Sequence, residues 1–360
     1  MADLFDPLTL RGLRLPNRIG ASPMCQYSAQ DGHPTDWHLV HLGGFAQGGA
    51  GLVMTEATAV APEGRISPQD LGLWQDSQVE PLARLAAFVR RQGAVPGIQL
   101  AHAGRKAGTE APWKGGGVIP LDQGGWQGVG PGPEPFDAGW NPPRSLDDAG
   151  LGQVVDSFRT AAARALAAGF QVVEVHSAHG YLLHQFLSPL SNRRQDAWGG
   201  SFQNRTRLVR EAAAAVRSVW PEPLPVLVRI SATDWVPGGW DLDQSVELAR
   251  LLASLGVDLV DCSSGGNVPR APIPMAPGYQ VPFAARIRRE AGLPTAAVGL
   301  ITRPAQARQI LEEGSADLVF LGRELLRNPR WPLAAAQDLG VVVPWPAPYA
   351  RAAAGPVPVR

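Results

Sequence analysis

Cysteine is scarce in this sequence, which has only Cys25 and Cys262 among 360 residues. Two thiols exclude a disulfide framework and any iron–sulfur or zinc site built from four thiolates. The chain shows no signal-peptide pattern at its start and no apolar run that approaches the length of a membrane span. We therefore expect a cytoplasmic protein that does not contact a membrane.

An excess of charge is also missing, because 32 Lys and Arg residues balance 32 Asp and Glu residues. Without a basic excess, nothing points to a nucleic-acid partner. The chain has neither a Gly-x-Gly-x-x-Gly turn between a strand and a helix nor a Walker A loop. These absences count against an open, doubly wound nucleotide-binding sheet.

What the sequence does contain is a repeating unit in which a helical stretch ends at a glycine and a short aliphatic run follows. Glycine supplies the left-handed turn that ends a helix. Continuous runs rich in Val, Ile and Leu are typical of strands buried on both faces. Six runs follow Gly51, Gly93, Gly169, Gly256, Gly292 and Gly314, and they cover residues 52–56, 95–100, 171–176, 257–262, 294–298 and 317–321.

Two further runs, residues 19–23 and 226–231, bring the number of predicted strands to eight. Eight strands that alternate with amphipathic helices predict an α/β fold, a (β/α)8 TIM barrel, as a single domain over residues 1–360. Residues 102–145 interrupt the rhythm after the third strand and are rich in Gly, Pro and Trp. A loop of this length is usually functional, and in a barrel it would cover the catalytic face.

The ends of the long loop and of the chain give two smaller predictions. Ser145 and Asp148 form a capping-box pattern, which predicts the start of the next helix. The tail, residues 341–360, is rich in Pro and Ala, and we expect it to be extended.

His176 and His179 are the most distinctive candidates for chemistry, because His176 ends the fourth predicted strand and His179 lies just beyond it. In barrel enzymes the active site lies at the carboxyl ends of the strands. Two imidazoles could donate hydrogen bonds to one substrate oxygen, could bind a metal ion, or could serve only the structure. A metal-dependent hydrolase is therefore an alternative function, although no convincing third ligand is present. Tyr181 could donate a proton or could simply pack.

Arg229 lies inside a predicted buried strand and therefore needs an anionic partner. The edge of a flavin that becomes negative on reduction would serve, and so would Glu174 or Asp261. Gly299, Gly322 and Arg323 end the last two strands. Barrels commonly bind phosphate at that place, where glycine permits close approach and arginine pairs with the anion.

Taken in order along nearly the whole chain, these residues resemble the Old Yellow Enzyme family. The resemblance is narrower to its thermophilic-like ene-reductase and xenobiotic reductase branch. The stretches that carry it are residues 4–8, 22–27, 56–58, 99–106, 176–182, 186–189, 192–194, 199–201, 228–231 and 321–324.

The resemblance implies FMN in the mouth of the barrel, NADPH or NADH as co-substrate, and no metal. His176 and His179 would hold the substrate oxygen, Tyr181 would donate a proton, and Tyr27 would line the substrate pocket. Arg351 in the tail would reach the site of a neighbouring subunit. The implied FMN contacts are Pro23, Met24, Cys25, Ala57, Gln99, Arg229, Ser264, Gly265, Gly299, Gly322 and Arg323, with Ser263 as the alternative to Ser264.

The implied activity is that of an NAD(P)H-dependent ene-reductase. NAD(P)H would reduce FMN, which would transfer hydride to the β-carbon of an activated alkene while the α-carbon is protonated. An enone, enal, maleimide or nitroalkene would be the substrate. The resemblance also implies a homo-oligomer, either a dimer or a tetramer.

Overall fold

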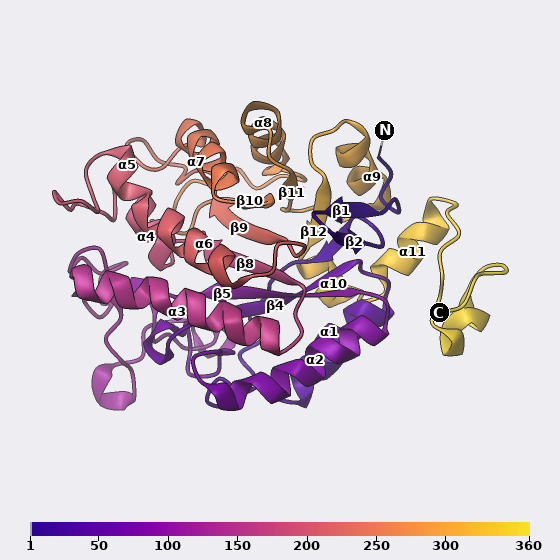
Figure 1. Cartoon of the computed structure of the whole chain (residues 1–360), viewed down its shortest axis with the longest axis horizontal. Coiled ribbons are helices and arrows are strands. Elements are labelled where there is room, and N and C mark those ends of the chain that lie inside the picture. Colours follow the sequence, from indigo (N-terminus) through magenta and orange to yellow (C-terminus); the bar gives the residue numbers. More distant parts are fainter. Residues whose placement is uncertain (1) are drawn as a thin grey trace.

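The eight predicted runs form one closed, parallel β-barrel in the computed structural model, which describes residues 2–360 (Figure 1). Every residue of the eight strands is buried, as continuous aliphatic runs require. The prediction of a (β/α)8 TIM barrel is confirmed. In order around the barrel the strands are β3 (Ile19–Ala21), β4 (Leu52–Ala59), β5 (Val95–Ala101), β8 (Val172–Ser177), β9 (Val226–Ser231), β10 (Leu259–Ser263), β11 (Thr295–Ala297) and β12 (Leu318–Leu321), which pairs with β3.

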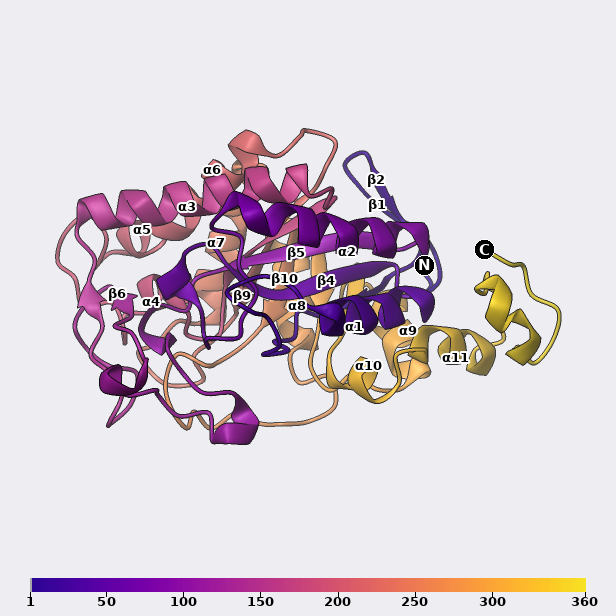
Figure 2. The ribbon, with the colours of Figure 1, turned by 90° about the horizontal axis from the view of Figure 1, so that it is seen from below.

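Helices connect the strands and cover the outside of the barrel (Figures 1 and 2). Their buried faces pack on the outer faces of the strands in one continuous apolar core. The helices are α1 (Asp36–Gln47), α2 (Val79–Arg91), α3 (Asp148–Ala167), α4 (Leu182–Leu187), α5 (Phe202–Arg205), α6 (Arg207–Val219), α7 (Leu242–Ser254), α8 (Val281–Ala291), α9 (Pro304–Glu312), α10 (Arg323–Arg327) and α11 (Trp331–Asp338).

Strand β4 runs three residues beyond its predicted end. Its register against β5 shifts between Met54 and Ala57, which marks a β-bulge. A bulge re-aims the side chains that follow it, and it often occurs beside active sites. After the shift, Ala57 pairs with Gln99, so two predicted flavin contacts lie side by side on neighbouring strands.

Five of the six helix-ending glycines have the predicted left-handed conformation, and Gly51 does not. Gly49, at φ 98°, takes that place after α1. A side chain at Gly51 is excluded for another reason, because its Cβ would lie 2.5 Å from Oδ1 of Asn17. The chain thus needs glycine at both positions, but for different reasons.

A short antiparallel hairpin, β1 (Leu8–Leu10) and β2 (Leu13–Leu15), closes the amino end of the barrel. Leucines at the first and last positions of each strand are buried, whereas Thr9 and Arg14 are exposed. The leucines pack with the residues that fill the barrel interior at that end, among them Leu52 and Leu227. Because this end is closed, access to the interior is left to the carboxyl ends of the strands.

The predicted loop over the other end contains short 3-10 turns and the pair β6 (Val129–Gly130) and β7 (Arg144–Ser145). It lies at the end opposite the β1–β2 hairpin (Figure 2). The Ser145 capping box is wrong, because Ser145 belongs to β7. Asp147 caps α3 instead, and its carboxylate accepts a hydrogen bond from the Gly150 N–H.

The tail is not wholly extended, because residues Ala347–Ala352 form 3-10 turns and Trp345 bridges to Val359. The Arg360 guanidinium donates to the carbonyl oxygens of Ala46 and Gln47 at the end of α1. The tail therefore lies at the amino end of the barrel, beside α11 (Figure 1). Within residues 2–360 no helix is both long enough and apolar enough to cross a membrane.

Candidate active site

The turn after β8 brings the three predicted catalytic side chains into one cluster. His179 and Gly180 both have positive φ angles, 58° and 72°, so the chain reverses sharply before α4. As a result the ring of His176 lies 5.2 Å from that of His179 and 5.1 Å from that of Tyr181, centre to centre. Both pairs meet nearly at right angles.

Close backbone packing fixes this turn. A Cβ on Gly180 would lie 2.1 Å from the carbonyl oxygen of Gly266, and a Cβ on Gly266 would lie 2.7 Å from the backbone of His179. The turns after β8 and β10 therefore touch through glycines that no other residue could replace without displacing the backbone.

The two histidines are neutral, because burial first and the charge of Arg229 next hold their pKa values well below the usual range. Nδ1 of His176 accepts a hydrogen bond from the Ala178 N–H, so the ring proton is on Nε2. Nε2 of His179 lies 2.7 Å from the Ser263 hydroxyl. If that hydroxyl donates, Nδ1 of His179 carries the proton and both rings can donate to one acceptor.

Cys25 and Tyr181 pack against one small apolar cluster that includes Ala57 and Ala101. Burial raises the pKa of the Cys25 thiol, and the carboxyl groups of Asp70 and Glu56 add to the effect. Burial also raises the pKa of the Tyr181 and Tyr27 hydroxyls. All three groups therefore keep their protons at neutral pH, so Cys25 is not a thiolate nucleophile.

Below the histidines, Arg229 shares the barrel interior with two carboxyl groups. Its Nε lies 3.1 Å from Asp261 and its Nη1 donates to Ser22 over 3.2 Å. Glu174 accepts a hydrogen bond from the Gln99 amide at 2.7 Å. Burial, with the charge of Asp261 next, raises the pKa of Glu174 to about 8, and burial raises that of Asp261 to about 6. Glu174 is therefore protonated near neutral pH. The Asp261 carboxylate is then the anion that balances the Arg229 guanidinium.

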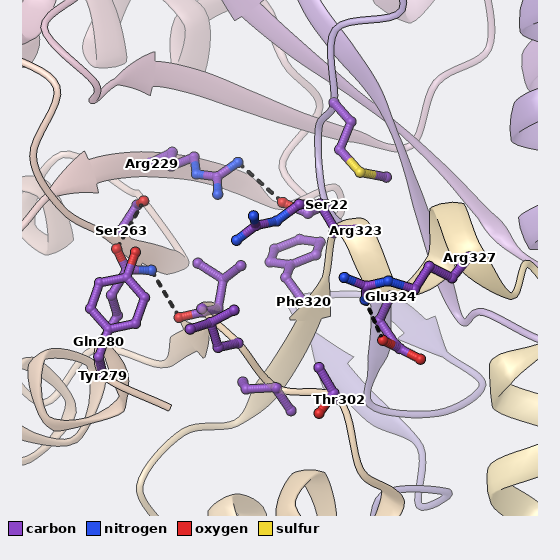
Figure 3. Close-up of a pocket in the computed structure, with 16 residues that line it drawn as sticks. Ser22, Arg229, Ser263, Tyr279, Gln280, Thr302, Phe320, Arg323, Glu324 and Arg327 are labelled. Carbon is purple, nitrogen blue, oxygen red and sulfur yellow. Dashed lines mark hydrogen bonds and ion pairs between the residues drawn. The ribbon is translucent and has the colours of Figure 1, made fainter. Parts of the chain in front are cut away.

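A cavity of about 240 Å³ opens beside Arg229 between the ends of β11 and β12 (Figure 3). Five predicted flavin contacts line it: Met24, Arg229, Gly299, Gly322 and Arg323. Sequence reasoning missed most of the remaining wall, which comprises Ser22, Ser263, Tyr279, Gln280, Val298, Leu300, Ile301, Thr302, Phe320, Glu324 and Arg327.

This cavity has the donors that a phosphate group needs. Within residues 2–360 the Arg323 guanidinium forms no hydrogen bond or ion pair, and Figure 3 shows it extending over the cavity. A Cβ on Gly322 would meet nothing closer than the Met24 sulfur at 3.7 Å, so the space above the Gly322 backbone is open. A free cation beside open backbone at the end of the last barrel strand fits the phosphate of a flavin mononucleotide.

The other predicted contacts lie around this cavity without lining it. Pro23 and Cys25 belong to the loop after β3, and Ala57 and Gln99 pair across β4 and β5. Of the two candidate serines, Ser263 lines the cavity, whereas the Ser264 hydroxyl donates to Gln280. Gly265, the next residue, adopts a left-handed conformation.

Arg351 does not join the site of its own chain. It lies in the 3-10 turns of the tail, at the opposite end of the barrel from His176. No group of three or more His, Cys, Asp or Glu residues suited to a metal ion occurs in the part of the chain that the structure describes.

The NADH:flavin oxidoreductase / NADH oxidase family matches the chain over residues 3–340. An NADPH dehydrogenase of Geobacillus thermodenitrificans is 51% identical over 350 residues, which are 97% of this chain and 98% of that protein. An NADPH dehydrogenase of Halalkalibacterium halodurans is 45% identical over 351 residues, again 97% of this chain and 98% of the relative.

The chain is also similar to solved structures of reductases. Morphinone reductase in complex with tetrahydroNAD has a TM-score of 0.78 and 28% identity over 97% of this chain and 93% of its own. The old yellow enzyme homologue from Zymomonas mobilis has a TM-score of 0.76 and 26% identity over 93% of both chains. The chain therefore belongs to the Old Yellow Enzyme family of NADH:flavin oxidoreductases and is a flavin-dependent NAD(P)H oxidoreductase.

Proposed function

We propose that this enzyme is an FMN-dependent ene-reductase that reduces activated alkenes such as enones, enals, maleimides and nitroalkenes. The observation that carries the proposal is the cluster of His176, His179 and Tyr181 beside Cys25 at the mouth of the barrel. In this cluster the two histidine rings can donate hydrogen bonds to one substrate oxygen, and the Tyr181 hydroxyl is protonated. The metal-dependent hydrolase has no support from the family to which the chain belongs.

FMN, when bound, supplies the redox chemistry: it takes hydride from NADPH or NADH and passes it to the β-carbon of the alkene. Arg323, with the open backbone at Gly299 and Gly322, would hold its phosphate. Arg229, Gln99, Ala57 and the 23–25 loop would contact its ring. Arg229 would offer positive charge to the ring edge that becomes negative on reduction, while Asp261 holds the guanidinium in place.

The histidines would act on the carbonyl or nitro oxygen of the alkene. Nε2–H of His176 and Nδ1–H of His179 would donate to this oxygen, where negative charge develops as hydride arrives. Neutral rings suit this role, because a neutral imidazole with one nitrogen already bonded has a fixed donor on the other. Ser263 would fix the tautomer of His179.

Tyr181 would complete the reaction by donating its proton to the α-carbon. Its raised pKa keeps the proton on the oxygen until the neighbouring carbon becomes basic. Tyr27, on the same side as Cys25, would line the alkene pocket. The neutral Cys25 thiol would tune the flavin rather than attack a substrate.

Anaerobic absorption spectroscopy tests the proposal. NADPH should bleach the flavin bands of the purified protein, and 2-cyclohexenone should restore them. Enzyme that NADPH reduces but that no enone, maleimide or nitroalkene reoxidises would contradict the alkene assignment and leave the family in place.

Three further features belong to this proposal. We expect NADPH as the better reductant, because the relatives at 51% and 45% identity are NADPH dehydrogenases. We also expect a dimeric or tetrameric enzyme in which Arg351 reaches a neighbouring subunit's site. A cytoplasmic location fits its two unpaired cysteines.

A further inference from the structure

Lys106 ends the 3-10 turn Gly104–Lys106 that follows β5, and it contacts the turn that carries His179, yet the steps above give it no role. Its Nζ donates to the carbonyl oxygens of His179 at 2.9 Å and Gly266 at 3.0 Å. It lies 5.1 Å from the centre of the Tyr181 ring and 4.5 Å from that of Phe136. The ammonium group is thus enclosed by two carbonyls and two aromatic rings.

The two carbonyls fix the place of the ammonium group relative to Tyr181. They belong to the turns after β8 and β10, which touch through Gly180 and Gly266. The preceding residue adds to this anchor, because the Arg105 guanidinium donates to the Asn267 carbonyl at 2.8 Å. Hydrogen bonds therefore join the loops after β5, β8 and β10 beside Tyr181, where the direction of its hydroxyl decides which substrate atom it can reach.

A cation over an aromatic ring acts on the acidity of a phenol. Attraction between an ammonium group and the ring is stronger when the ring carries the negative charge of a phenolate. Protonated Lys106 therefore favours release of the Tyr181 proton and works against burial, which disfavours the phenolate.

We propose that Lys106 is a positioning residue for the proton step: its ammonium group, held over the Tyr181 ring, makes that hydroxyl a stronger acid toward the α-carbon of the alkene. The inference rests on the proposed function, because it assigns a helper to the Tyr181 step. Lys106 does not line the cavity assigned to the flavin phosphate.

The pH dependence follows from the surroundings of the amine. The titratable and charged groups near Lys106 are Arg105 on its own turn and His176, His179 and Tyr181 on the turn after β8. Phe136 and Gly266 add no charge. Burial, with the charge of Arg105 next, lowers the pKa of Lys106 to about 8. The alkene half-reaction should therefore slow as the pH rises through this range, because the ammonium group is lost.

The test is stopped-flow measurement of both half-reactions in FMN-loaded Lys106→Met and Lys106→Arg, each also combined with Tyr181→Phe. Lys106→Met should slow reoxidation by 2-cyclohexenone roughly three- to tenfold, where about tenfold is the full effect of one pKa unit of donor strength and partial proton transfer in the transition state gives less. Reduction by NADPH should change less than roughly twofold, because the protonated hydroxyl takes no part in it. Lys106→Arg keeps the charge and should recover most of the rate without the slowing near pH 8.

The double variants separate action through Tyr181 from a merely structural role. In the Tyr181→Phe background, Lys106→Met should cause almost no further loss. An equal loss in both backgrounds would overturn the inference, and so would a Lys106→Met enzyme as fast as its parent. Wild-type enzyme that no alkene reoxidises would instead overturn the proposed function, and the inference with it.

A second readout does not depend on turnover. The chain has four tyrosines, so fluorotyrosine labelling gives four fluorine NMR signals, and Tyr181→Phe identifies one of them. That signal should titrate at lower pH in Lys106→Arg than in Lys106→Met, because only arginine keeps its charge at the pH where a phenol ionises. Identical titrations would overturn the inference.

Discussion

At the scale of single residues, protonation states in this site follow from what each group touches. His176 is a neutral donor because burial opposes its charge and the Ala178 N–H occupies Nδ1. Tyr181 keeps its proton because burial opposes the phenolate. The same buried environment thus gives a neutral hydrogen-bond donor at His176 and an acid that keeps its proton at Tyr181, which is the pairing that the proposed alkene reduction needs.

The double variant His176→Ala with His179→Ala should retain FMN but bind phenols at least about 100-fold more weakly, since two hydrogen bonds to a charged oxygen are lost. Titration of the flavin absorbance with a phenol gives the affinity. His33→Ala, which removes a histidine bonded to Ser77 outside the site, is the matched control. Unchanged phenol affinity in the double variant would remove the histidines from substrate binding.

Glu174 should make the stability of the protein depend on pH. Its pKa in the folded state, about 8, is above its ordinary value of 4.5, so the folded protein holds this proton more tightly than the unfolded chain. The stabilisation is complete below the ordinary pKa and is lost as the pH rises toward the folded value. Glu174→Gln should therefore flatten the fall in melting temperature between about pH 5 and 8. The same slope as in Glu312→Gln, a change at an exposed glutamate, would contradict this account.

At the scale of elements, the two ends of the barrel differ: the amino end is closed by apolar packing, and the carboxyl end carries the candidate active site. The β1–β2 hairpin fills the amino end with leucines, and the loops after β5, β8 and β10 meet at the carboxyl end. The two ends meet at Val298 and Phe320, which belong to the apolar cluster of the hairpin and also line the cavity. We expect the chemistry to tolerate packing changes in the hairpin itself, because the hairpin leucines do not line that cavity.

Leu15→Ala should destabilise the fold by about 2–5 kcal/mol, since the side chain is fully buried in the hairpin that closes the barrel. The rate per folded molecule should be unchanged. Chemical denaturation and the fraction of bound flavin measure the two quantities. Thr9→Ala, on the exposed face of the same hairpin, should change stability by less than about 0.5 kcal/mol. A catalytic defect in folded Leu15→Ala would show that the two ends are coupled.

At the scale of the whole molecule, Arg351 lies far from the candidate active site of its own chain. The tail is anchored at the amino end of the barrel through Arg360 and α1. Arg351 can therefore contribute to an active site only if a second copy presents its carboxyl-end loops to this tail.

Mixing two impaired variants, assayed at an alkene concentration well below the raised KM, tests this arrangement. If Arg351 serves a neighbouring site, Arg351→Ala should raise the KM for alkenes and leave NADPH reduction unchanged. Hybrids of Arg351→Ala with the double histidine variant should regain up to about a quarter to a half of the parental activity, because intact sites form between unlike subunits. Sedimentation velocity should show an even-numbered oligomer. A monomer with full activity would exclude a role for the tail.

The sequence by itself determined the barrel and the strand ends at which the candidate residues lie. A strand that is buried on both faces is mostly aliphatic, so it is readily recognised in a sequence. Polar residues within the last part of such a run, or directly after it, mark the carboxyl end of the strand. His176, Arg229 and Gly322 could be placed for that reason. The family resemblance rested on the same short stretches.

Only the tertiary structure decided which side chains meet. The contacts between Lys106 and Gly266, between His179 and Ser263, and between Ser264 and Gln280 join segments far apart in the chain, so no periodicity reveals them. The carboxylate partner of Arg229 was left open between Glu174 and Asp261, because only the stagger of β9 against β10 places Asp261 beside it. Periodicity follows from each residue's own burial, whereas hydrogen bonds depend on the distance between two parts of a folded chain.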